Sequence, residues 1–119
     1  MIRVIVQGGE DFQRFLAAAP QAIQKSLDGT AGVLADMTTA RAKQIVPVRT
    51  GTLQRSIETR RLGPCKYAVE TVVEYAPLVE FGTMYMRAQP FMRPALNEMA
   101  PRFADLFGEA LRANWRSLW

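Results

Sequence analysis

The feature that most constrains the fold is a long apolar stripe between two prolines, Pro20 and Pro47. Its members recur at spacings of three and four: Ile23, Leu27, Ala31, Leu34 and Met37, with Ile45 in phase. This spacing puts them on one face of a helix, so a helix is expected from about Pro20 to Ile45. At about 1.5 Å per residue it would be about 39 Å long, enough to cross a whole domain. Gly29 and Gly32 are costly inside such a helix and predict a kink, a break or a close crossing with a strand.

Alternating β-branched residues predict strands elsewhere in the chain. Ile2, Val4 and Val6 form one such strand before Gly8 and Gly9, and a short helix is expected from near Asp11. A hairpin is expected further on, with strands at residues 52–60 and 66–74 joined by the turn Leu62–Cys65. On the second strand Glu70 and Glu74 alternate with apolar residues, which is typical of a solvent-facing side.

Prolines mark the elements after the hairpin. Pro77 suits a first helical turn, so a short helix is expected over residues 77–81, ended by Gly82. Pro94 is expected to begin the C-terminal helix, which Pro101 should kink or divide. Near its end, Trp115 and Trp119 are expected to pack on the core or on a partner.

These patterns predict an α+β fold: a small, mostly antiparallel sheet of about three to four strands, packed by one long helix, plus a C-terminal helix. The length of 119 residues predicts one domain over the whole chain. The N-terminus lacks the pattern of a signal peptide, and no apolar run approaches the roughly 18 residues that span a membrane.

The composition argues against an enzyme. The chain has no histidine and a single cysteine, Cys65, which excludes most zinc sites and histidine-assisted nucleophiles. Glu70, Glu74 and Glu80 could in principle hold Mg²⁺ or act as a carboxylate pair, with spacing as their only support. No catalytic residue, metal or cofactor is therefore expected.

Positive charge is concentrated between Arg41 and Lys66, where seven cations stand against one acid, Glu58. Within that stretch the candidates for facing DNA are Arg49, Arg55, Arg60, Arg61 and Lys66. We expect them to gather where the hairpin tip meets the end of the long helix and to act by diffuse charge, since no aromatic is interleaved before Tyr67. The other interpretation is helix-end compensation and a solvated hairpin tip.

A run of large side chains without any period follows Gly82. Met84, Tyr85 and Met86 are neighbours, and such residues are enriched at adaptable interfaces. We expect a protein interface formed by Met84, Tyr85, Met86, Arg87 and Phe91. The alternative is a loop folded over its own core.

Three motifs in one order resemble a known family. They are VPVRTGTL…SI at residues 46–57, YAPLVEFGT at 75–83 and QPFMRPAL at 89–96, ahead of a C-terminal helix. This order resembles the tail-completion, or head–tail joining, proteins of long-tailed bacteriophages, over roughly residues 15 to 115.

The resemblance implies a structural neck protein in the virion, made in the host cytoplasm and working in a homo-oligomeric ring, with a hexamer expected. Its partners would be other copies, other neck and tail proteins, and the genomic DNA passing through the lumen, with no membrane. The alternative, from the basic hairpin alone, is a small non-specific nucleic-acid-binding protein.

Overall fold

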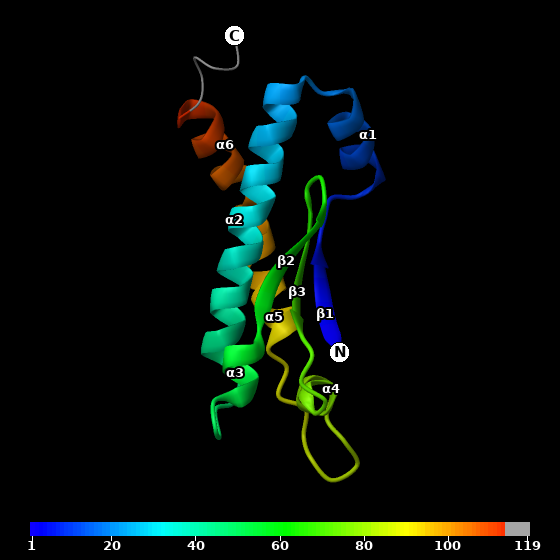
Figure 1. Cartoon of the computed structure of the whole chain (residues 1–119), viewed down its shortest axis with the longest axis vertical. Coiled ribbons are helices and arrows are strands. Elements are labelled where there is room, and N and C mark those ends of the chain that lie inside the picture. Colours follow the sequence, from blue (N-terminus) through cyan, green and yellow to red (C-terminus); the bar gives the residue numbers. More distant parts are fainter. Residues whose placement is uncertain (114–119) are drawn as a thin grey trace.

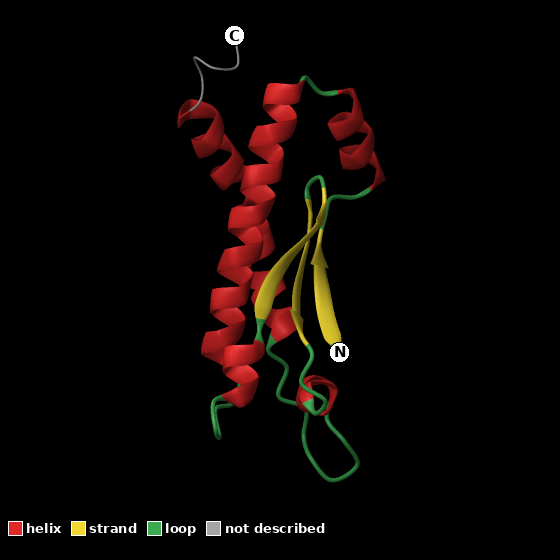
Figure 2. Cartoon of the chain, in the orientation of Figure 1, coloured by secondary structure: helices red, strands yellow, loops and turns green. Residues whose placement is uncertain are grey.

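The structure, a computed structural model that describes residues 1–113, has the predicted α+β architecture. In chain order its elements are β1 (Ile2–Val6), α1 (Glu10–Ala18), α2 (Gln21–Ile45), α3 (Thr52–Ser56), β2 (Glu58–Gly63), β3 (Lys66–Thr71), α4 (Ala76–Phe81), α5 (Met92–Met99), the 3₁₀ helix η1 (Ala100–Arg102) and α6 (Phe103–Ala113). The body measures 57 × 25 × 20 Å, with α2 and the sheet running along its long axis (Figures 1 and 2).

Helix α2 is unbroken over its 25 residues and ends at Ile45, as predicted. Val46 adopts an extended conformation (φ −58°, ψ 136°) because Pro47 follows it. A kink, a break or a close crossing with a strand is expected at the glycines, and Gly32 lies at such a crossing. A Cβ there would be 3.0 Å from the Tyr67 hydroxyl of β3. At Gly29 a Cβ would meet no atom within 4 Å.

The sheet is three-stranded and antiparallel, in the order β1-β3-β2. Val69 of the central strand lies between Val4 and Thr59 and is completely buried. Helix α2 packs beside β2 and β3, while α5 packs near β1 (Figure 1). The buried face of α2 includes Ala35, Thr38 and Ala42, each 0 % exposed, so small residues widen the predicted apolar stripe.

Two predicted strand boundaries are wrong. Residues 52–56 form helix α3 instead of the start of a strand, because Gly51 takes a left-handed conformation (φ 83°) and its carbonyl accepts the Arg55 N–H at 3.0 Å. Leu53 and Ile57 are four residues apart, a spacing that fits one face of either a helix or a strand. Strand β3 ends at Thr71, whose hydroxyl accepts the Val73 N–H at 3.2 Å.

Asp28 joins α2 to the tip of the β2–β3 hairpin, which turns at Pro64 and Cys65. Its carboxylate accepts the Cys65 N–H at 2.8 Å and the hydroxyl of Tyr67 at 3.3 Å, and pairs with Arg61 at 3.3 Å. Cys65 has a positive φ of 53°, which is uncommon for a residue other than glycine. The Asp28 contact therefore stabilises an unfavourable turn conformation.

The C-terminal helices begin and end near the prolines as predicted, except that the first of them starts two residues before Pro94. Helix α5 begins at Met92, so Pro94 lies in its first turn instead of opening it. The predicted interruption at Pro101 is confirmed by η1 between α5 and α6. Trp115 and Trp119 lie outside the described residues.

Candidate functional site

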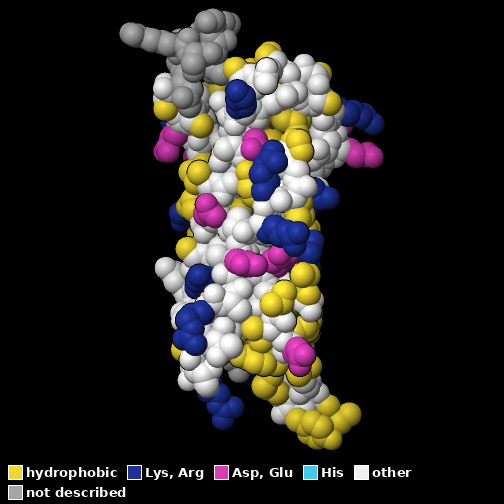
Figure 3. Space-filling view, in the orientation of Figure 1, with side chains coloured by type: hydrophobic (Ala, Val, Ile, Leu, Met, Phe, Trp, Pro, Cys, Tyr) yellow, Lys and Arg dark blue, Asp and Glu magenta, His cyan; other side chains and the backbone are white. Residues whose placement is uncertain are grey.

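Large apolar side chains are exposed together at one end of the long body (Figure 3). They belong to α4, the residues just before it and the loop after it: Val72, Tyr75, Leu78, Phe81, Met84, Tyr85 and Met86. Tyr75, Leu78 and Phe81 are three residues apart and therefore share one side of the α4 turn. We call these seven residues the apolar end. Contiguous exposure of this kind marks interaction sites on soluble proteins.

The loop at residues 83–86 is a compact turn, which we call the finger. The Thr83 N–H donates to the Met86 carbonyl at 2.8 Å. The Thr83 hydroxyl in turn accepts the N–H groups of Tyr85 (3.1 Å) and Met86 (3.0 Å). Between these bonds Met84 and Tyr85 are 88 % and 93 % exposed. The finger thus holds two large apolar side chains in solvent in a defined conformation.

The base of the finger is narrow, and Gly82 makes this possible. Gly82 has φ 77° and ψ 177°, a region that only glycine occupies readily. A Cβ at this position would lie 2.7 Å from the backbone nitrogen of Ala88. The Gln89 N–H donates to the Val79 carbonyl at 2.8 Å and ties the returning chain to α4.

Of the predicted interface residues, Phe91 differs from the others because it is 0 % exposed and belongs to the core of its own chain. Beside it, the buried carboxylate of Glu80 accepts the Met92 N–H at 2.8 Å and caps the start of α5. Met84, Tyr85, Met86 and Arg87 are all exposed. The sequence did not single out Tyr75, Leu78 and Phe81, although their spacing of three was a usable signal.

A hollow of about 420 Å³ lies next to the finger, and we call it the socket. The connection between α2 and α3 forms one wall, α4 with Tyr75 forms another, and the base of the finger closes it. Its lining is Pro47, Arg49, Thr50, Gly51, Leu53, Tyr75, Leu78, Val79, Met86 and Gln89.

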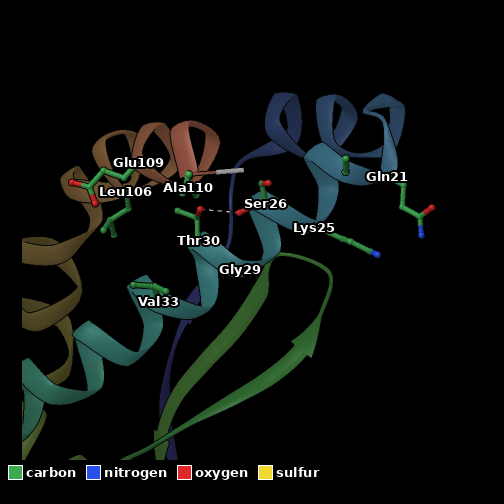
Figure 4. A pocket seen from close by; sticks show the side chains of 11 residues that line it. Gln21, Lys25, Ser26, Gly29, Thr30, Val33, Leu106, Glu109 and Ala110 are labelled. Carbon is green, nitrogen blue, oxygen red and sulfur yellow. Dashed lines mark hydrogen bonds between the residues drawn. The ribbon is translucent and has the colours of Figure 1, made fainter. Parts of the chain in front are cut away.

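A larger groove of about 780 Å³ lies at the other end of the molecule, between α2 and α6 (Figure 4). Small or short side chains line most of it, including Ser26, Gly29 and Thr30, and the Thr30 hydroxyl donates to the Ser26 carbonyl at 2.8 Å. Its charged lining residues are Lys25 and Glu109. Its lining residues within the described part of the chain form no cluster of groups suited to catalysis.

The candidate DNA-facing residues do not gather in one place, contrary to expectation. The hairpin tip contacts α2 at Asp28. Helix α3 contacts α2 fifteen residues further on, where the Lys43 carbonyl accepts a hydrogen bond from the Gln54 side chain. These positions are about 22 Å apart along the helix axis at about 1.5 Å per residue. Arg49 and Arg55 lie near the second position, and Arg60, Arg61 and Lys66 belong to the hairpin.

Two of these cations have acidic partners. Arg61 pairs with Asp28 at 3.3 Å, which raises the pKa of Arg61. Arg60 lies 3.7 Å from Glu70, which also pairs with Arg3 at 3.1 Å. The other three candidates, Arg49, Arg55 and Lys66, are exposed and form no ion pair within residues 1–113.

The glutamates considered for a metal site are in separate places. Glu70 is only 2 % exposed, so the prediction of a solvent-facing position is wrong: the carboxylate lies beneath the arginines of the neighbouring strands. Glu80 caps α5, and Glu74 is exposed. Over the described part of the chain, no three acidic, cysteine or histidine side chains cluster as metal ligands would.

Comparison with known proteins gives one match. Residues 10–82 match the model of a family named HK97-gp10_like and described as "Bacteriophage HK97-gp10, putative tail-component". The chain belongs to this family. The match runs from α1 to Gly82, the residue after α4, and so includes most or all of the first two motifs. It confirms the resemblance to a phage tail protein. No curated protein and no solved structure matches the chain.

Membership of the HK97-gp10-like family assigns the chain to the structural tail components of bacteriophages and hence to the virion. Its partners are accordingly other structural proteins of the phage. None of the helices within residues 1–113 has the length and apolar character needed to cross a bilayer.

Proposed function

We propose that this HK97-gp10-like protein is a neck component that joins the phage tail to the DNA-filled head as part of a homo-oligomeric ring. Six copies are the expected number, located at the neck or tail top after synthesis in the host cytoplasm. The exposed apolar end carries this proposal. A protein acting alone would gain from burying Tyr85, Met84 and Phe81, which are 93 %, 88 % and 69 % exposed.

The ring would surround the genomic DNA on its way through the neck. The support for this part is the formal net charge of +4 and the three exposed, unpaired cations described above. Diffuse positive charge can attract a duplex without holding it. The alternative function, a small nucleic-acid-binding protein, would need concentrated phosphate contacts and a steep dependence of DNA affinity on salt.

Removal of the protein during infection tests the proposal. Without it, electron microscopy should show filled heads and separate, complete tails. Empty heads would indicate a role in DNA packaging, and tails of abnormal length a role in tail assembly. Either result would contradict a joining function.

A triple substitution tests whether the finger forms the interface. Met84→Ser, Tyr85→Ser and Met86→Ser together should leave the circular dichroism spectrum and melting temperature nearly unchanged, because these side chains are exposed. The variant should nevertheless fail to join heads to tails. A large loss of stability would show that the finger belongs to the core of its own chain.

A further inference from the structure

The geometry of the apolar end points to the partner of the finger: we propose that Tyr85 and Met84 of one copy insert into the socket of the next copy. This inference rests on the proposed ring and specifies how its subunits contact one another. In a ring the contact is head-to-tail, with the finger of each copy in the socket of the next. Repetition of such a contact produces a ring when the rotation closes.

The finger has an ordered backbone before it meets any partner. Its backbone is fixed by the hydrogen bonds between Thr83 and Met86, and the bond from the Gln89 N–H to the Val79 carbonyl holds its base. A loop ordered before binding loses less conformational entropy when it docks. The finger also cannot fill its own socket, because Met86 at its base forms part of the socket wall while Tyr85 is 93 % exposed.

The socket matches the tip of the finger in chemistry. Leu53, Leu78 and Val79 provide apolar walls for the Met84 side chain and the ring of Tyr85. A buried tyrosine hydroxyl needs a hydrogen-bond partner, and the socket offers polar groups on Arg49, Thr50 and Gln89. A volume of about 420 Å³ lies within the usual range of about 300–1,000 Å³ for a binding pocket.

The contact between one finger and one socket buries little surface, so we expect it to form only in the assembled particle. Two large side chains bury about 150–250 Å² each at most, whereas a stable interface needs about 800 Å² per partner. Even with Leu78 and Phe81 at its border, one finger contact is weak in isolation. The purified protein is therefore expected to be a monomer at low concentration, and the contact to form in the assembled particle.

Cysteine cross-linking in purified virions tests the contact. Thr50→Cys places a thiol on the socket. Arg87→Cys places one beside the finger and leaves the inserted Met84 and Tyr85 side chains intact, because Arg87 is exposed and directly follows Met86. A chain carrying both, treated in particles with a mild oxidant, should give a ladder of dimers, trimers and larger products on a non-reducing gel. The native Cys65 is 1 % exposed and should not take part. Each single variant should stay monomeric, as should Lys66→Cys combined with Arg87→Cys, since Lys66 lies on the hairpin.

The outcomes separate the two proposals. If the protein is present in particles but the double variant gives no more cross-linking than the single variants, the insertion is wrong and the joining function is unaffected. Dimers without larger products would show reciprocal exchange between two copies and would overturn the head-to-tail arrangement. Absence of the unmodified protein from purified particles would overturn the joining function itself.

A second variant gives an independent readout. Leu78→Glu changes the socket without touching the finger, and the Leu78 side chain is 49 % exposed, so folding should be retained. This variant should reduce joining to the level of the triple serine variant of the finger. Normal joining by folded Leu78→Glu would contradict the proposed socket.

Discussion

At the scale of single residues, Gly29 and Gly32 of α2 have different surroundings. Gly32 lies against the Tyr67 hydroxyl, where an added Cβ would be only 3.0 Å away. Gly29 faces the open groove between α2 and α6 (Figure 4). Close packing therefore explains Gly32, and nothing in the structure explains Gly29.

We expect Gly29→Ala to stabilise the protein by about 0.5–1 kcal/mol, the usual gain when alanine replaces glycine inside a helix. Gly32→Ala is the matched control. It should gain less or lose stability, because Tyr67 must move and its bond to Asp28 would weaken. Urea denaturation measures both, and a destabilised Gly29→Ala would show that the groove is tighter than the structure indicates.

Cys65 predicts a pH dependence of stability. Burial, helped by the charge of Asp28, raises the pKa of the Cys65 thiol from 9.0 to about 11. Between these values the unfolded chain releases the proton more readily than the folded chain, so the free energy of unfolding falls as pH rises. The loss should be about 1 kcal/mol by pH 10.

Denaturation at pH 8 and pH 10 measures this loss, and Cys65→Ala removes the contribution of the thiol. Because the pKa of Tyr67 is also raised, chiefly by burial, part of the dependence should remain in that variant. An equal pH dependence in both proteins would contradict the assignment to Cys65.

At the scale of elements, one carboxylate connects the long helix to the hairpin. Asp28 is the only acceptor found for the Cys65 N–H among the hydrogen bonds of residues 1–113. Asp28→Ala should cost about 1–3 kcal/mol, because a half-buried donor loses its partner. Asp28→Asn should cost less, since its side-chain oxygen can still accept that bond.

Asp36→Ala is the control for this comparison, because Asp36 is exposed on the same helix. It should change the free energy of unfolding by less than about 0.5 kcal/mol. Thermal denaturation of the three variants gives the order. An Asp28→Ala variant as stable as Asp36→Ala would show that the hairpin tip needs no anchor on α2.

At the scale of the whole molecule, the proposed interaction surface lies at one end of an elongated body. The radius of gyration is 16.2 Å, whereas a compact domain of this length would have about 13.5 Å. The apolar end and the α2–α6 groove therefore lie at opposite ends of a 57 Å body. Such a body can contact its neighbours at one end and present other surfaces along its length.

The ion pairs of the basic residues determine which of them can be substituted to test whether DNA passes beside this protein. Reversal of Arg60 and Arg61 would also remove partners of Glu70 and Asp28, so their effect on function would be mixed with a loss of stability. Arg55→Glu with Lys66→Glu avoids this problem, because both cations are exposed and unpaired within the described chain.

If these two residues face the lumen, the double variant should form particles of normal appearance and eject DNA more slowly. Its melting temperature should be nearly unchanged, as exposed charges contribute little to stability. Arg102→Glu with Arg112→Glu is the control, because these two exposed cations at the other end of the chain give the same change in net charge. Ejection at the normal rate and yield would exclude Arg55 and Lys66 from the lumen.

The sequence by itself determined the elements that depend on local chemistry. The end of α2 follows from Pro47, the short helix α4 from Pro77 and Gly82, and the interruption after α5 from Pro101, because prolines act on the residues next to them. The periodicity of α2 and the alternation of β1 gave the α+β class for the same reason. The resemblance to phage tail proteins likewise needed no structure.

Tertiary structure decided what depends on contacts between distant residues. The four-residue spacing of Leu53 and Ile57 fits either a helix or a strand and did not decide between them. In the folded chain this segment is helix α3, whose Gln54 side chain donates to the Lys43 carbonyl of α2 at 2.9 Å. Glu70 alternates like a surface residue, yet Arg3 and Arg60 cover it from the neighbouring strands. Phe91 and Tyr85 have similar apolar surroundings in the sequence, but one is 0 % and the other 93 % exposed. Burial is a property of the assembled fold, because it depends on elements that pack together from far apart in the chain.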